Sequence, residues 1–182
     1  MQKAEVQKAL ERFRDHVVSV SKRNLTNSKK NSSKKLYNSI KGNVKAMPNS
    51  FSMEFTMEDY GVFQDAGVSG TKKKYNTPYS YKSKGGKRGL KGMPPPKDFD
   101  KWIVRKGLAP RKSGGQFTSR KSLAFLIAKS VFRNGIKPSL FFTKPFEAAY
   151  KNLPQELVEA YGLDAIELFN EQIDQIIKNG NN

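Results

Sequence analysis

The sequence contains no cysteine and a single histidine, His16, among its 182 residues. Without thiols the chain can form no disulfide, present no thiolate nucleophile and hold no cysteine-bound metal. With only one imidazole in addition, a structural zinc site is excluded. His16 lies within a helical pattern beside its apolar face, so we interpret it as a surface or hydrogen-bonded histidine.

Long apolar runs are also missing. No stretch approaches the roughly 18–20 apolar residues that a membrane span requires. Charged residues at Lys3, Glu5 and Lys8 interrupt any signal-peptide core at the N-terminus. We therefore expect a soluble protein that is made in the cytoplasm and has no membrane partner.

Residues suited to catalysis are sparse. Glu54, Glu58, Asp59 and Asp65 are close in sequence, and such a set could hold Mg²⁺ for phosphodiester cleavage. They come from a strand, a turn and a loop that need not converge, so we favour a solvated acidic face or a partner contact. The glycine-rich residues 84–89 lack the strand and helix of a nucleotide site. We therefore expect no enzyme activity, metal or cofactor.

Positive charge dominates the composition but is unevenly distributed. The formal net charge is +18, and residues 71–121 carry 16 basic and 2 acidic groups. Residues 1–48 carry 12 basic and 3 acidic groups, whereas residues 49–70 carry 4 acidic groups and no basic one. Residues 144–182 carry 3 basic and 7 acidic groups. This asymmetry suits binding to DNA or head-to-tail contact between identical copies.

The apolar pattern predicts a single α+β domain over residues 1–182, with a small antiparallel sheet packed against several helices. Residues 2–24 form an amphipathic helix with Val6, Leu10, Phe13 and Val17 on one face. Residues 50–57 alternate strictly and predict a half-buried strand, with residues 44–47 as its possible partner.

Helices are also predicted over residues 98–106 and 120–134, where Trp102 and Leu126 should face the core. Residues 145–182 form a C-terminal helical region that should break or bend near Pro154 and Gly162.

Residues 71–97 are predicted to form a long, extended basic arm. They hold nine Lys or Arg and no Asp or Glu, and residues 94–96 are a proline spacer. Such a segment buries too little apolar surface to fold alone and needs an anionic or interfacial partner. We expect DNA or a neighbouring subunit to contact the following residues: Lys72, Lys73, Lys74, Tyr75, Tyr79, Tyr81, Lys82, Lys84, Lys87, Arg88 and Lys91.

Roughly residues 1–150 resemble the tail-completion and neck proteins of tailed bacteriophages, which connect head and tail. The shared order is a first helix, a Leu-x-x-Ser-Ile turn over residues 36–40, an alternating strand and two short motifs. Residues 59–71, DYGVFQDAGVSGT, follow the strand with a turn typical of that family, in which we single out Tyr60, Gly61, Asp65, Gly67 and Thr71. Residues 136–146, IKPSLFFTKPF, fit the apolar segment that enters a later helix in the family. The sequence departs from the family pattern at Asp65, where glutamate is usual.

The resemblance implies a structural virion protein that forms a ring of about six or twelve copies in the neck or tail. Its partners would be portal, neck and tail proteins, with transient, non-specific contact to passing DNA. The residues themselves leave two other functions open: a basic nucleic-acid-binding protein using residues 71–121, and a metal-dependent nuclease built on Glu54, Asp59 and Asp65.

Overall fold

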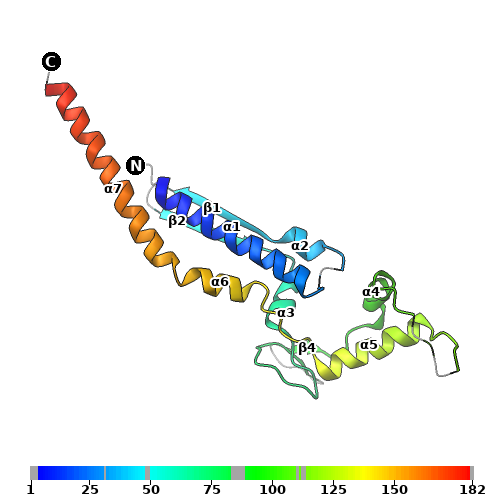
Figure 1. Cartoon of the computed structure of the whole chain (residues 1–182). Coiled ribbons are helices and arrows are strands. Elements are labelled where there is room, and N and C mark those ends of the chain that lie inside the picture. Colours follow the sequence, from blue (N-terminus) through cyan, green and yellow to red (C-terminus); the bar gives the residue numbers. More distant parts are fainter. Residues whose placement is uncertain are drawn as a thin grey trace.

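The computed structural model describes residues 4–30, 32–47, 50–82, 89–109, 111 and 114–180 of the elongated chain (Figure 1). Within these residues the chain forms seven α-helices, one short 3-10 helix and two small strand pairs. The predicted α+β class with a small antiparallel sheet is therefore confirmed. In the same described residues, no helix is both long enough and apolar enough to cross a membrane.

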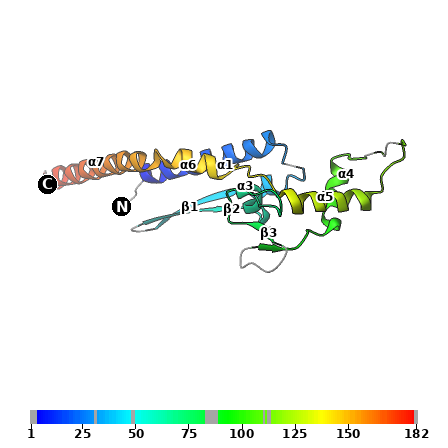
Figure 2. The ribbon, with the colours of Figure 1, turned by 90° about the horizontal axis from the view of Figure 1, so that it is seen from below.

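The first half of the core is a helix laid on a hairpin. Helix α1 (Ala4–Asn27) packs on one face of strands β1 (Lys41–Met47) and β2 (Ser50–Thr56), which pair antiparallel. Figure 2 shows α1, α6 and α7 on the same side of this hairpin. Strict alternation puts Phe51, Met53 and Phe55 on the helix side, where they pack against the core. Both predicted strands and the predicted helix are confirmed.

A second core cluster joins the end of α1 to the middle of the chain. Helix α2 (Lys35–Ser39) and the residue after it supply Leu36 and Ile40, which are buried with Leu25 of α1 and with Phe141. Helix α3 (Tyr60–Ala66) follows the hairpin. This cluster fixes α2 and the segment before α6 on the same end of α1.

The C-terminal region is helical, as predicted. Helix α6 (Thr143–Tyr150) begins two residues before Pro145, and helix α7 (Leu153–Gly180) contains Pro154 in its first turn, where proline is tolerated. The predicted break near Pro154 is confirmed by the turn at residues 151–152 between α6 and α7, whereas α7 continues through Gly162 without a break. Aromatic rings join α6 to the hairpin and α1: Phe142 lies 5.5 Å from Phe55 and Phe146 lies 5.6 Å from Phe13, centroid to centroid.

The prediction of an extended arm is wrong for the described part of residues 71–97. The backbone N–H of Thr71 donates to Phe132 at 2.9 Å, and that of Tyr81 donates to Ser69 at 2.8 Å. Strand β3 (Ser80–Lys82) pairs in parallel with strand β4 (Gly89–Lys91). The segment folds because its tyrosines pack against apolar residues elsewhere in the chain. The composition of the segment alone does not show that these contacts bury apolar surface.

The rest of the molecule forms a smaller helical end. The 3-10 helix η1 (Pro96–Phe99) leads into helix α4 (Asp100–Arg105), and both contact helix α5 (Arg120–Asn134). The predicted proline spacer therefore ends in a helical turn. Ile103, Ala124 and Ala128 are buried here, whereas the predicted core residues Trp102 and Leu126 are exposed. Because Ala124 and Ala128 are small, α5 can pack closely against α4. The larger side chains of Trp102 and Leu126 lie on the outer surface instead.

Candidate functional site

A basic cleft lies at the end of the molecule that carries α4 and α5. It has a volume of about 690 Å³ and is bordered by the α1–α2 loop, α3, η1, α4 and α5. We call it the basic cleft and define it by its lining residues: Lys29, Lys30, Ser32, Ser33, Lys35, Tyr60, Gln64, Asp98, Phe99, Trp102, Arg105, Lys106, Ile127 and Val131. Five of these side chains are cationic, so the cleft favours acidic groups.

The backbone orients several of the cations. Lys30 Nζ donates to the carbonyl of Lys137 at 3.1 Å, and Lys106 Nζ donates to the carbonyl of Lys29 at 3.3 Å. Burial lowers the pKa of Lys30, and the carboxylate of Asp65 opposes that shift. Lys35 forms an exposed ion pair of 2.9 Å with Glu58 at one border. The remaining cations, among them Arg105, are exposed.

Apolar side chains are interleaved with these charges. Phe99, Ile127 and Val131 are half-buried in the lining, and the rings of Tyr60 and Trp102 are exposed. Aromatic rings beside cations are typical of surfaces that bind partners, because they offer large contact areas with few rotatable bonds. The cleft can therefore accept a ligand that is acidic on one side and apolar on the other.

Two residues of the family-like turn, Gly61 and Asp65, have structural roles. Asp65 is 7% exposed, and its Oδ1 accepts hydrogen bonds from the backbone N–H groups of Phe142 (2.8 Å) and Thr143 (3.3 Å). Its Oδ2 accepts one from the hydroxyl of Thr143. Asp65 therefore caps helix α6 from another part of the chain. A side chain at Gly61 would lie 2.8 Å from Leu36, so glycine allows α3 to approach α2.

The predicted contact residues of the basic segment divide into three groups. Lys72, Lys73 and Lys74 are exposed. The tyrosines turn inward: Tyr79 stacks edge-on with Phe63 at 4.8 Å, Tyr81 is buried against Phe132, and Tyr75 is half-buried beneath the Lys73 ammonium. Lys82 and Lys91 end strands β3 and β4, while Lys84, Lys87 and Arg88 lie outside the described residues.

The four acidic residues considered as a metal site do not form one. Asp65 faces α6, Glu58 pairs with Lys35, and Glu54 lies on the exposed face of the hairpin opposite Asn43. Among the described residues, no three histidine, aspartate or glutamate side chains gather closely enough to hold a metal ion.

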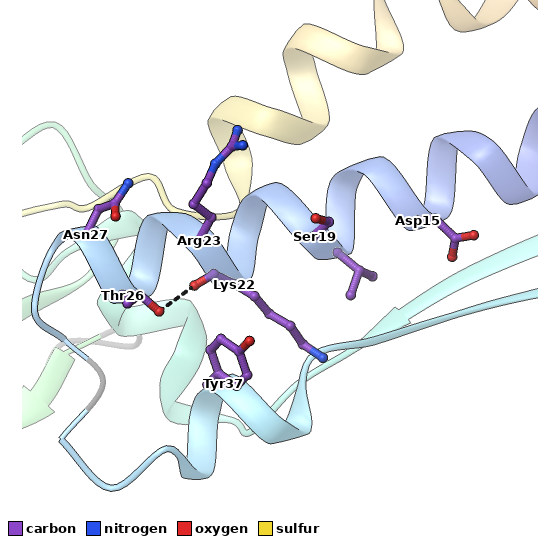
Figure 3. A pocket seen from close by; sticks show the side chains of 8 residues that line it. Asp15, Ser19, Lys22, Arg23, Thr26, Asn27 and Tyr37 are labelled. Atoms are coloured by element: carbon purple, nitrogen blue, oxygen red, sulfur yellow. Dashed lines mark hydrogen bonds between the residues drawn. The ribbon is translucent and has the colours of Figure 1, made fainter.

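Other hollows lie on the surface of the described residues. One of about 580 Å³ lies between the second half of α1 and Tyr37 of α2, with the Lys22 ammonium 5.4 Å from the Tyr37 ring (Figure 3). Another is lined by His16, Arg12 and Glu156. His16 is exposed there, as the sequence predicted.

The sequence did not predict the basic cleft: Tyr60 of the family-like turn lines it, but none of the described contact residues predicted in the basic segment does. Its lining comes from five segments between residues 29 and 131, and no local pattern links Lys29 or Tyr60 to Trp102. The exposure of Trp102 could not be foreseen from its spacing, which also fits a core position. In comparisons with known proteins, no family model, curated protein or solved structure matches the chain.

Proposed function

We propose that the chain is a structural virion protein of a tailed bacteriophage, a subunit of a ring in the neck or tail through which DNA passes. One observation carries the proposal. Residues 100–134 hold nine basic and one acidic group, whereas α7 holds six acidic and one basic. These two regions lie at opposite ends of the elongated molecule (Figure 1). Complementary opposite ends favour heterologous contacts between copies, and such contacts form a ring when the rotation between neighbouring copies closes.

The two segments that resemble neck proteins also meet in the structure. Val68 and Ile136 exchange backbone hydrogen bonds of 2.8 Å, and the carbonyl of Asp65 accepts from Ser139 and Leu140. The two segments therefore form one junction between the α1–hairpin core and the α5 end, although about 70 residues separate them in sequence. A shared junction supports the resemblance more than two unrelated short matches would.

Mass spectrometry of purified phage particles tests this function. The chain should be present in particles in a copy number close to a multiple of six, and deletion of its gene should yield DNA-filled heads without attached tails. A chain that is present in the infected cell but absent from particles would overturn the proposal, as would normal particles from the deletion.

A nucleic-acid-binding function is the second candidate, and the exposed cations favour it. Lys72, Lys73 and Lys74 lie on the surface, as do Arg105 and Lys106 at the cleft. Fluorescence anisotropy with labelled duplex DNA separates the two functions. A channel lining should bind weakly, without sequence preference, and lose affinity steeply with salt. Tight, sequence-dependent binding at physiological salt would favour the second function.

A further inference from the structure

We infer that helix α7 of one copy docks into the basic cleft of the next copy. The inference rests on the proposed ring and names its contact: the occupant of the cleft is the acidic, amphipathic α7 of an identical chain.

Among the described residues, the first part of α7 packs against α1. Leu153, Leu157 and Ala160 pack against α1, and Asp164 reaches the first turn of α1. Because α1 begins at Ala4, beside Asp164, the rest of α7 extends beyond the α1–hairpin core (Figure 1).

Large apolar side chains lie on the exposed surface of α7. Val158 is 73% exposed and Ile166 is 59% exposed. In the sequence, Phe169, Ile173 and Ile176 continue the helical spacing of 3 and 4 after Ile166. A solvent-exposed helix face does not usually carry an apolar stripe of this length. Such a stripe is typical of a helix that inserts into a groove.

Acidic residues lie along one side of this stripe. Glu159 and Glu167 are exposed, eight residues apart, on the part of α7 that extends along and past α1. The basic cleft offers a matching surface, because its lining combines Phe99, Ile127 and Val131 with the cations of Lys29, Arg105 and Lys106. Its volume is in the range of about 300–1,000 Å³ that specific binding pockets occupy, so it can receive several side chains of one helix face.

These features favour α7 of a second copy over other occupants. Pairing of two α7 helices would oppose Glu159 and Glu167 with acidic residues, which is repulsive. Nucleic acid would satisfy the cations but not the apolar part of the cleft. The cleft and the projecting part of α7 lie at opposite ends of the molecule (Figure 1), so one chain cannot satisfy both and each copy extends the assembly.

Paired charge reversal tests the contact. The helix variant is Glu159→Lys with Glu167→Lys, and the cleft variant is Arg105→Glu with Lys106→Glu. Matched controls reverse exposed charges elsewhere: Glu147→Lys on α6 and Lys41→Glu on the hairpin. Sedimentation velocity at low salt measures self-association, negative-stain microscopy shows closed rings, and circular dichroism confirms folding.

The full-length wild type and both controls should self-associate, and each reversal variant should associate more than about tenfold more weakly, because like charges then face each other. An equimolar mixture of the two variants should restore assembly, since each helix then meets a cleft of opposite charge. A mixture that stays dissociated overturns the inference, and so does normal assembly of either variant. The inference is also overturned if the wild type stays monomeric, or if the cleft variant loses oligonucleotide binding but still self-associates.

Failure of this contact and failure of the proposed function give different results. If the chain is a ring subunit joined by another surface, it is found in particles and wild-type rings form, but the reversals leave them intact. If it is not a virion protein, it is absent from particles whatever the reversals do.

Discussion

Asp164 of α7 caps the start of helix α1 through Val6, 158 residues earlier in the chain. Its carboxylate accepts hydrogen bonds from the backbone N–H groups of Glu5 (3.0 Å) and Val6 (3.2 Å), and the residue is 3% exposed. Asp65 does the same for α6. In both cases a distant carboxylate satisfies first-turn N–H groups and lies at the positive end of the helix dipole.

Removing the Asp164 carboxylate should destabilise the fold. Asp164→Ala leaves one buried and one half-buried N–H group without this acceptor, so the free energy of unfolding should fall by about 1–2 kcal/mol. Urea unfolding followed by circular dichroism measures this change. Glu171→Ala, an exposed acid on the same helix, is the control and should change it by less than about 0.5 kcal/mol. Equal effects of the two substitutions would show that the cap contributes nothing.

Asp65→Ala should have a similar or larger effect, because it also removes the partner of the Thr143 hydroxyl. We expect a loss of about 2 kcal/mol, whereas Asp59→Ala, an exposed acid six residues earlier, should be nearly neutral. Amide hydrogen exchange adds a local readout: the first turn of α6 should lose protection in the Asp65 variant. Unchanged protection of Phe142 and Thr143 would contradict the assigned cap.

The sequence predicted the α1–hairpin core well because that part obeys simple periods. Val6, Leu10 and Phe13 repeat at helical spacing, and residues 50–57 alternate, so each element reveals its buried face locally. The same reasoning failed for residues 71–82, where Tyr79 and Tyr81 pack against Phe63 and Phe132. Contacts so distant in sequence leave no local periodicity.

The sequence predicted the positive charge of a partner-binding region, but not the position of the candidate site. An excess of Lys and Arg over residues 71–121 indicated an anionic partner, but the cleft combines Lys29 and Tyr60 with Trp102 and exists only after folding. The two capping aspartates also carry no sequence signal, because Asp65 and Asp164 are not adjacent to the helices they cap. The sequence indicates Asp65 through the family resemblance and as one of four nearby acidic residues, but not as a helix cap, and it does not indicate Asp164.

Two leucine substitutions test the revised core. Leu25 is fully buried in the second core cluster, whereas Leu126 is 56% exposed on α5, although its spacing predicted a core position. Leu25→Ala should lower the free energy of unfolding by about 2–5 kcal/mol through lost burial and a cavity. Leu126→Ala should lower it by less than about 1 kcal/mol. Thermal melts of both variants measure the difference, and a reversed order would show that α5 is turned the other way.

The junction between residues 68–71 and α5 should be the point least tolerant of an added methyl group. Gly135 has a φ of 73°, and a Cβ there would overlap the carbonyl oxygen of Val68, which accepts a hydrogen bond from Ile136. Gly107 has a similar φ of 61°, but a Cβ there meets nothing within 4 Å. Comparing alanine substitutions at the two glycines therefore distinguishes the cost of backbone strain from the cost of steric overlap.

Gly107→Ala should cost about 1–2 kcal/mol, the strain of a positive φ alone. Gly135→Ala should cost about 3 kcal/mol or more, because residues 68–70 must also move away from α5. Chemical denaturation measures both values, and hydrogen exchange at Val68 and Ile136 shows whether their paired hydrogen bonds open. Equal costs, with Val68 still protected in the Gly135 variant, would mean that the junction can adjust to a methyl group.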